Sequence, residues 1–456
     1  MYWKNCFNKN CFNKIGAIAV AIALWTGPCA AQQDVSPETL QHILDRLDTL
    51  EKQNEQLLTE VQQLRTAVKA AQAESAVRAQ AQQDRAEVTA QQVKDQAQTK
   101  VESSQRFPIT LTGMFLFDSY LFTGPPDPEY GYLSGYSDGI PSAGATLAQS
   151  IIGLDFRGPA LPGGGKIHGS LSMDFYSESG GYNLFRLRRG VLSFDWARRS
   201  LIVGQDKPLI APLQPTSFAR VGVPPLSGAG NLWLWLPQVR YEERVPFSVN
   251  TQATFQAAMI ETNESYVAPY LPENSTLETA RPAIQARFEI AHHWGEESRL
   301  AIGLGGHASS SHLLGHSVPS RVISADLLYK PLEKLQISGT ILHGENFANL
   351  GGEPPGVTVR KNGDVVPIHG SAGWMQVALP VTSRLTFNVY AGRQVNDPND
   401  LNSYAFVRTL TYAGNVLYRL SPNVILGLEG SQNDLEYLSG RRLLTNRYDA
   451  TFAYLF

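Results

Sequence analysis

Cysteine is scarce in this chain of 456 residues, and the three that occur, Cys6, Cys11 and Cys29, all lie among the first 31 residues. That stretch has the order of a secretory signal peptide: lysines, then the eleven-residue apolar run 15–25, then small residues up to Ala31. We expect cleavage after Ala31. All three cysteines then leave with the signal, which excludes disulfides and thiolate chemistry from the mature protein.

A lipoprotein signal is the alternative for this N-terminus, and it would make Cys29 the first mature residue. Pro28 directly before the cysteine fits that signal poorly. The ordinary signal peptide, residues 1–31, is therefore the preferred interpretation.

Long apolar runs are missing from the rest of the sequence. A bilayer-spanning helix needs about 20 apolar residues, so the sequence excludes a helical membrane protein. Because every backbone polar group must be paired in lipid, only a closed β-barrel remains as a spanning structure. An excess of positive charge is missing too. Removing three of the 38 basic residues with the signal leaves 35 against 41 acidic ones, a net charge of −6, which disfavours nucleic acid as a partner.

Residues 35–104 differ from everything after them, because they contain no glycine and no aromatic residue and are rich in Gln, Ala, Glu and Lys. Ser36-Pro37-Glu38 is typical of a helix start. Apolar residues then recur at spacings of three and four residues, which predicts an a/d seam of five heptads. The seam consists of Leu40, Ile43, Leu47, Leu50, Asn54, Leu57, Val61, Leu64, Val68 and Ala71.

This seam predicts a coiled coil in which Asn54, the one polar member, fixes the register. An amphipathic helix packed on a globular core is the alternative, but the seam is too narrow and the other faces are too polar for it. Dimer and trimer both fit the mixture of Leu, Val and Ile. Either one implies several copies of the following domain side by side.

From residue 107 to residue 456, short alternating segments separated by turn signals predict an antiparallel transmembrane β-barrel. We expect an even number of strands, sixteen. They are 107–122, 145–158, 166–178, 183–197, 200–206, 231–244, 248–260, 282–294, 298–308, 319–330, 334–345, 369–380, 384–394, 407–420, 423–432 and 444–456.

The connections alternate in length, as short periplasmic turns and long external loops do in a membrane barrel. A soluble sandwich gives no reason for that alternation. The short connections are 197–199, 246–247, 295–297, 331–333, 381–383 and 421–422, and the long ones are 123–144, 207–230, 261–281, 346–368 and 395–406.

Strand faces predict a polar interior. In 282–294, for example, the apolar side chains from Ile284 to Ile290 oppose Gln285, Arg287 and Glu289. Unpaired charges in a dry core would cost several kcal/mol each. The sequence therefore predicts a water-filled lumen, for which sixteen strands leave room. Trp233 and Trp235 are expected in the aromatic girdles, together with Tyr454 and Phe456.

The segment 446–456 alternates almost without fault. Arg447, Asp449 and Thr451 share the polar face of this predicted strand. Its aromatic face resembles that of the closing strand of bacterial outer-membrane barrels. The resemblance implies an assembly signal read by the insertion machinery, made of Tyr448, Phe452, Tyr454 and Phe456.

The connection 207–230 is rich in proline and fairly apolar, so we expect it to be stiff and partly buried. It follows a predicted hairpin at 185–190, Phe-Arg-Leu-Arg-Arg-Gly, and then Val203-Gly204-Gln205. These features resemble sixteen-stranded porins, whose third external loop folds inward and narrows the pore. With the coiled coil in front, the chain resembles the DcaP-type trimeric porins.

Basic residues gather around this connection. Arg186 and Arg188 share a strand face that we assign to the lumen, and Arg240 should face inward from the next strand. Lys207 and Arg220 are the only charges in the connection itself. The hypothesis is an electropositive constriction that favours anions. The alternative is ordinary lumen charge, balanced by Asp155, Asp174, Asp206, Glu242 and Glu289.

Arg189 falls on the lipid phase of the same predicted strand, where an arginine costs about 2–4 kcal/mol at mid-membrane. Two explanations stay open. Either a bulge at Gly190 resets the strand, or Arg189 lies in an interface between protomers.

Two other patterns do not support a metal site or an active site. His307, His312 and His316 flank a serine-rich predicted loop, but no carboxylate supports a metal site there. His168-Gly169-Ser170 has the His-x-Ser spacing of outer-membrane phospholipases, but both side chains point into the predicted lumen, away from lipid. We expect no enzyme, no metal and no cofactor.

The sequence thus predicts an oligomeric, trimeric channel in the bacterial outer membrane for small hydrophilic solutes, with the coiled coil in the periplasm. The alternative is a structural tether, in which the coiled coil contacts peptidoglycan and the barrel is only an anchor. Sixteen strands are more than an anchor needs.

Overall fold

The computed structural model describes residues 109–123, 142–176, 185–264, 267, 278–279, 282–295, 297–403 and 405–456, together with 45, 46, 48, 52 and 59. The signal peptide expected at 1–31, Asn54 and nearly all of the expected coiled coil lie outside the described residues. The chain divides into two units, Met1–Thr99 and Lys100–Phe456. In the first, the five described residues are helical, and Lys52 Nζ pairs with Asp48 at 2.8 Å. No helix formed by the described residues is long and apolar enough to cross a membrane.

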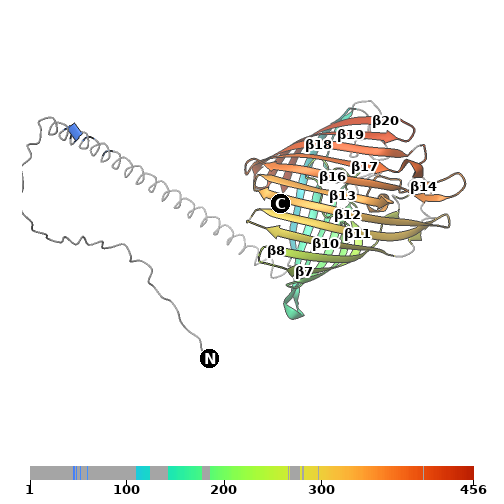
Figure 1. Cartoon of the computed structure of the whole chain (residues 1–456), viewed down its shortest axis with the longest axis horizontal. Helices are drawn as coiled ribbons and strands as arrows, with labels where there is room; N and C mark the ends of the chain where they lie inside the picture. Colours follow the sequence, from blue (N-terminus) through green and yellow to red (C-terminus); the bar gives the residue numbers. More distant parts are fainter. Residues whose placement is uncertain are drawn as a thin grey trace, which may run out of the picture. The chain divides into compact units, whose positions relative to one another are not determined.

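The second unit is a closed antiparallel β-barrel of sixteen strands, which confirms the predicted fold class (Figure 1). Each strand pairs with the next along the chain, and β20 pairs with β1 to close the barrel. The strands are β1 (Ile109–Phe122), β3 (Ile151–Leu161), β4 (Gly165–Asp174), β5 (Arg186–Asp195), β6 (Arg199–Asp206), β7 (Leu236–Pro246), β8 (Thr251–Ile260), β10 (Ala283–His293), β11 (Arg299–Leu313), β12 (His316–Leu332), β13 (Leu335–Glu345), β16 (His369–Pro380), β17 (Leu385–Asn396), β18 (Phe406–Ser421), β19 (Val424–Tyr437) and β20 (Arg442–Leu455).

Short elements complete the barrel wall and its rims. β2 (Ser142–Thr146) extends the line of β3 along β1, and β9 (Glu278–Thr279) extends that of β10 along β11. A separate two-stranded ribbon is formed by β14 (Val357–Val359) and β15 (Val365–Pro367). The 3-10 turns are η1 (Pro162–Gly164), η4 (Phe347–Leu350) and η5 (Pro398–Asp400).

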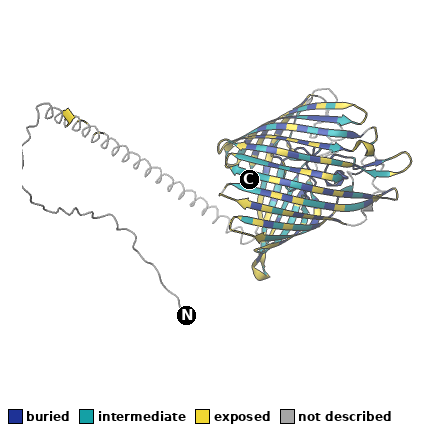
Figure 2. Cartoon of the chain, viewed as in Figure 1, coloured by how far each residue is buried: buried dark blue, intermediate teal, exposed yellow. Residues whose placement is uncertain are grey.

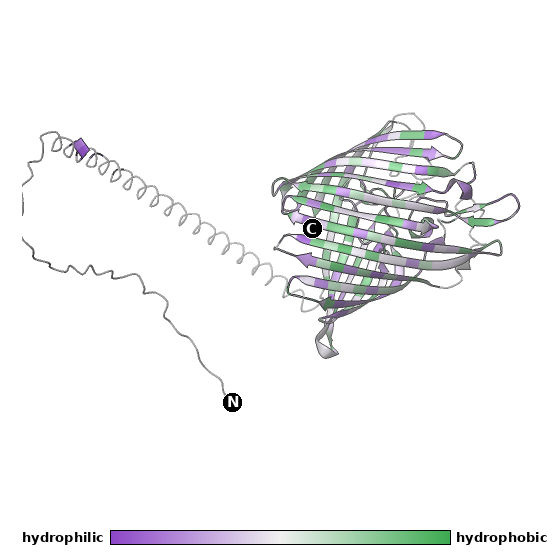
Figure 3. Ribbon diagram, viewed as in Figure 1, coloured by the Kyte–Doolittle hydropathy of each residue, from purple (hydrophilic) through white to green (hydrophobic). Residues whose placement is uncertain are grey.

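Burial alternates along the strands with a period of two, because successive side chains point to opposite faces (Figure 2). Hydropathy alternates as well, although less regularly (Figure 3). In β20, Tyr448, Phe452 and Tyr454 are exposed on the outer face, whereas Arg447 and Asp449 are buried on the inner one. The wall is therefore apolar outside and polar inside, as the sequence predicts.

The end of the chain pairs with the start of β1. Phe456 N donates to Gly113 O at 3.1 Å, and Gly113 N donates to Phe456 O at 2.9 Å. A Cβ on Gly113 would lie 2.4 Å from Ile151 O of β3 and 2.7 Å from the Phe456 ring, so glycine lets β3 and the terminal aromatic side chain approach β1 closely.

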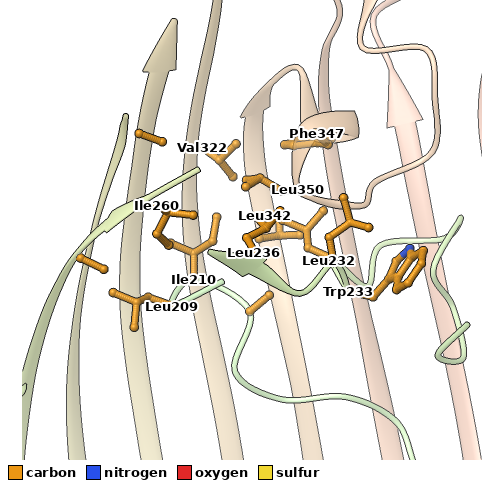
Figure 4. Packing of buried hydrophobic residues seen from close by; sticks show 14 of the residues in the cluster. Leu209, Ile210, Leu232, Trp233, Leu236, Ile260, Val322, Leu342, Phe347 and Leu350 are labelled. Carbon is orange, nitrogen blue, oxygen red and sulfur yellow. The ribbon is translucent and has the colours of Figure 1, made fainter. Parts of the chain in front are cut away.

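The tryptophan prediction was wrong. Residues 231–235 precede β7 instead of belonging to it, so Trp233 and Trp235 do not lie in an outer girdle. Trp233 is buried inside the barrel with Leu209, Ile210 and Leu232 (Figure 4). The same cluster includes Phe347 and Leu350 of η4, so the connection after β13 also folds inward. The interior thus holds an apolar cluster as well as polar groups, which the prediction of a wholly wet lumen missed.

The predicted serine-rich loop is also strand. β11 continues to Leu313 and pairs with β12 through Ser309, Ser310 and Ser311. Beyond Arg321 the barrel wall continues as a hairpin with only Leu314 and Gly315 at its turn. The alternation of short and long connections is therefore broken at this point.

Candidate functional site: the loop inside the barrel

The segment 207–230, here called the inner loop, runs through the interior of the barrel. Leu209 N donates to Gln285 Oε1 of β10 at 2.7 Å. Further along, Thr216 N donates to Gln376 Oε1 of β16 at 2.6 Å, and Thr216 O accepts from Asn415 Nδ2 of β18 at 2.8 Å. Inward side chains of three distant strands therefore hold its backbone.

A buried glutamine holds the inner loop on the opposite wall. Gln149 Nε2 donates to Ala219 O at 2.9 Å. Its Oε1 accepts from Val221 N at 2.7 Å and from Gly222 N at 2.8 Å. A buried amide with donor and acceptor both used positions the backbone firmly. No sequence motif distinguishes Gln149 from other strand-end glutamines.

Two glycines let the loop backbone touch the wall directly. Gly230 has φ +99°, and a Cβ there would lie 2.5 Å from Gly373 N of β16. A Cβ on Gly392 of β17 would lie 2.2 Å from Ala229 O. A side chain at either position would have to displace the loop.

Replacing Gly392 with leucine is accordingly expected to push the end of the inner loop away from β17. Overpacking of this kind costs about 1–3 kcal/mol unless the loop moves. We expect faster cleavage of the loop in limited proteolysis and a changed single-channel conductance. Gly414→Leu is the matched control, because a Cβ on Gly414 meets no atom closer than 3.7 Å. Equal behaviour of the two variants would contradict the contact.

A β-bulge in β5 explains Arg189. Ser172 of β4 pairs with Arg189, whereas Met173 pairs with Leu187, so Arg188 is an extra residue in β5. A bulge re-aims the side chains beside it. Arg188 and Arg189 therefore both lie on the inner side with Arg186. Of the two explanations left open, the bulge holds, but it falls at Arg188 instead of Gly190.

Asp174 forms ion pairs with two of these arginines. Its carboxylate accepts from Arg186 Nε at 3.0 Å and Nη2 at 2.7 Å, and from Arg188 Nη1 at 2.8 Å. The same guanidiniums reach the inner loop, because Arg186 Nη2 donates to Gly222 O at 2.5 Å and Arg188 Nη1 to Val221 O at 2.8 Å. Two arginines thus anchor the loop and carry charge beside it.

Asp206 pairs with two other arginines of this region. Arg189 Nε lies 3.0 Å from Asp206 Oδ1, and Arg240 Nη2 lies 3.4 Å from Asp206 Oδ2. Lys207 N donates to Asp206 Oδ1 at 2.9 Å, and the Lys207 ammonium donates to Gln214. Arg186, Arg188, Arg189, Lys207 and Arg240 form what we call the basic cluster.

Aromatic rings contact two arginines of this cluster. The Arg188 guanidinium carbon lies 4.5 Å from the centre of the Trp235 ring, and that of Arg186 lies 4.4 Å from the centre of the Tyr176 ring. Cation–π contacts of this length fix an arginine without neutralising it. Trp235 therefore lies inside the barrel and not in the outer girdle that its sequence predicts.

Four of the five basic residues proposed from the sequence are brought together here: Arg186, Arg188, Lys207 and Arg240. Arg220 is not among them. It is buried, its N donates to Ser217 Oγ at 3.1 Å, and it follows Ala219 at the Gln149 wall. The additional member is Arg189, which only the bulge reveals.

A second buried group of charges holds the far side of the inner loop. Arg447 is fully buried and lies 2.6 Å from Asp449 and 3.1 Å from Asp118. Its Nη2 also donates to Ala219 O at 3.3 Å. Glu429 accepts from Tyr390 at 2.7 Å and from Asn415 at 2.9 Å nearby in the wall. These acids face Arg447 and not the basic cluster.

The histidines have ordinary surroundings. His307 is buried on the inner face with Gln285 Nε2 at 3.0 Å from its Nδ1. His168 faces inward and lies 3.2 Å from Asp195, whose carboxylate also accepts from Ser193. Among the described residues, no group of three His, Cys, Asp or Glu side chains is placed to hold a metal ion.

No protein-family model matches the chain, and no curated protein sequence matches it. Solved structures do. The outer membrane channel DcaP of Acinetobacter baumannii matches with a TM-score of 0.61 and 18% identity, over 76% of this chain and 97% of that one. An anion-selective porin from Comamonas acidovorans matches with a TM-score of 0.51 and 15% identity, over 76% and 99% of the two chains. Identities this low show a shared fold.

Proposed function

We propose that this chain, whose barrel has the sixteen-strand fold of outer-membrane porins and resembles DcaP, is a porin that lets small hydrophilic solutes diffuse across the outer membrane, with a preference for anions. The basic cluster beside the inner loop carries the proposal. Four guanidiniums pair with two carboxylates there and the Lys207 ammonium is beside them, which leaves three positive charges in excess.

The exposure of these groups supports the sign of the preference. The side chain of Asp174 is 0% exposed and that of Asp206 is 11% exposed, whereas those of Arg186 and Arg189 are 23% and 48% exposed. An ion in the lumen therefore meets the cations first. A ring of basic side chains between low-dielectric walls concentrates anions.

The balancing acids of the alternative hypothesis bear on the same point. Glu242 pairs with Arg244 at 2.5 Å, and Glu289 pairs with Arg287 at 2.7 Å. Both are occupied outside the basic cluster. Asp174 and Asp206 are the balancing acids that do face the cluster, and they offset only two of its five cations.

Solvent inside the barrel supports a passage. Thr216 is bonded to the inner wall through Gln376 and Asn415, yet Thr216 and Gln214 are exposed. Water therefore reaches the middle of the inner loop. The anion-selective porin among the structural neighbours agrees with the preference that we propose.

Single-channel recording in planar bilayers tests the function. The folded full-length protein should give discrete conductance steps, and its reversal potential in a potassium chloride gradient should have the sign of an anion preference. Folded protein that inserts without conductance would rule out the channel. A reversal potential with the sign of a cation preference would rule out the anion preference and leave the channel function standing.

Lys207 gives this preference a pH dependence. Burial lowers the pKa of the Lys207 ammonium to about 8, although the neighbouring Asp206 carboxylate acts to raise it. The ammonium is thus mostly charged at about pH 7 and mostly neutral at about pH 9, so anion preference should fall as the pH rises between them. Lys207→Arg should remove the dependence, because a guanidinium stays charged. An equal pH response in that variant would contradict the role of Lys207.

We further propose the organisation expected from the sequence: a signal peptide at 1–31, a trimer joined by a periplasmic coiled coil at 35–104, and the aromatic signal Tyr448, Phe452, Tyr454 and Phe456 for assembly. Deleting 35–104 separates this function from the tether to peptidoglycan. A channel keeps its unit conductance after the deletion, whereas a tether loses envelope integrity. Light scattering of the two purified forms reports the oligomeric state.

A further inference from the structure

The outer wall carries a groove across β11, β12, β13, β16 and β17. This shallow groove has a volume of about 980 Å³ and is mostly apolar. Small residues form its floor on β16 and β17, because Gly373 and Ala391 face outward at diagonal register positions. Larger outward side chains border them: Ile341, which projects between Ala325 and Gly373, and Met375, which pairs with Ala391. A concave strip of this kind fits a chain of methylene groups better than a flat surface does.

Two groups that can carry positive charge flank the groove. Arg393 pairs in register with Gly373, and His343 pairs with Ser371, two positions further along β16. Both side chains are exposed, and His343 Nδ1 lies 2.9 Å from Ser371 Oγ. β13 and β17 are two strand spacings apart, about 10 Å. Arg393 and His343 therefore flank the small residues of β16 from both sides.

The charge of the groove is uncompensated within its lining. None of the described residues that line it carries a carboxylate. The neighbouring outward arginines differ in this respect, since Arg321 lies 3.6 Å from Glu345 and Arg408 lies 3.2 Å from Asp434. A guanidinium facing lipid is unfavourable unless an anion accompanies it.

The level of the groove along the strands indicates that this anion belongs to a lipid headgroup. Toward the middle of the barrel the outward residues of β16 and β17 are apolar, as at Met375 and Val389. Toward the long-loop end charged groups appear, at His369 of β16 and at its register partner Glu345 of β13. The groove crosses this boundary, which is where acyl chains give way to headgroups in a bilayer.

We propose that the groove binds lipid A, the phosphorylated and multiply acylated anchor of lipopolysaccharide in the outer leaflet, with a phosphate on Arg393 and His343 and an acyl chain over Gly373 and Ala391. The inference rests on the proposed function, which places the long-loop end outside. A phosphate supplies the acceptor that Arg393 needs, with bidentate geometry. A second copy of this chain fits less well, because it would have to place a carboxylate at Arg393 and also a protruding apolar surface in the groove.

Native mass spectrometry of the detergent-solubilised full chain with purified lipid A tests the proposal. The wild type should retain lipid A, and Arg393→Glu should bind it about tenfold more weakly, because a charge-assisted contact becomes repulsive. Ala391→Trp should weaken binding as well, by filling the floor. The controls Arg384→Glu, in a short turn, and Ala286→Trp, outward on β10, should bind like the wild type.

Three results would overturn the proposal: equal binding by all variants, equal retention of dephosphorylated lipid A or phosphatidylglycerol, or a changed oligomer mass for Arg393→Glu, which would make this face a protomer interface. Conductance is read separately. Arg393→Glu should conduct like the wild type, so a channel that binds no lipid A refutes the groove and leaves the proposed function standing.

Discussion

Replacing Arg447 with glutamine is expected to lower the free energy of unfolding of the barrel by about 3–5 kcal/mol, because it leaves buried carboxylates without their cation. Arg447 is fully buried between Asp118 and Asp449, and it also holds Ala219 O of the inner loop. Thermal unfolding followed by circular dichroism measures the loss. Single-channel noise should rise too, since the loop loses one of its attachments.

Two further variants make this result interpretable. Arg447→Gln combined with Asp449→Asn should recover part of the stability, because one uncompensated charge is removed. Arg442→Gln on the same strand should change little, since the Arg442 side chain is exposed and its partner Asp434 keeps Arg408 as a second cation. If the Arg442 and Arg447 variants unfold alike, the buried cluster does not stabilise the barrel.

The second large effect concerns ion selectivity. In Arg189→Gln/Lys207→Gln the basic cluster loses two of five cations, while Arg186 and Arg188 still hold the inner loop. A unit charge about 4 Å from a passing ion contributes about 1 kcal/mol in water, before screening by salt. We therefore expect the permeability ratio of chloride to potassium to fall by about tenfold.

Reversal potentials in a potassium chloride gradient measure this ratio. Lys166→Gln is the control, because Lys166 also lies on the inner face, but near η1 at the short-turn end of β4. An unchanged ratio in the double variant, or an equal fall in the control, would show that the basic cluster does not set the preference.

The barrel could be predicted because its cause is local. Alternation in β20, such as Arg447 and Asp449 against Tyr448 and Phe452, follows from the period of a strand in contact with lipid on one side. The prediction of four basic-cluster residues had the same basis. Arg186, Lys207 and Arg240 lie within or beside strands whose phase can be read from the sequence.

The predictions that were wrong depend on how strands and loops pair with one another, which the alternation along a single strand does not show. The bulge at Arg188 shifts β5 by one residue, and only its register against β4 shows this. Trp233 and Trp235 look like girdle residues, but the chain enters β7 later than their alternation indicates. The apolar cluster joins Leu209 to Phe347 across more than a hundred residues, so no local pattern announces it.

The attachments of the inner loop share one property. Gln149, Gln285 and Gln376, like Arg186, Arg188 and Asn415, are side chains of the wall that bind backbone N–H or C=O groups of the loop. Every residue offers those groups, except for the N–H of proline. Side chains of the wall thus fix the route of the loop, and the loop side chains that are exposed to the lumen are free to differ while the route stays the same. Related barrels could exchange solute preference by changing residues such as Gln214 without rebuilding the frame.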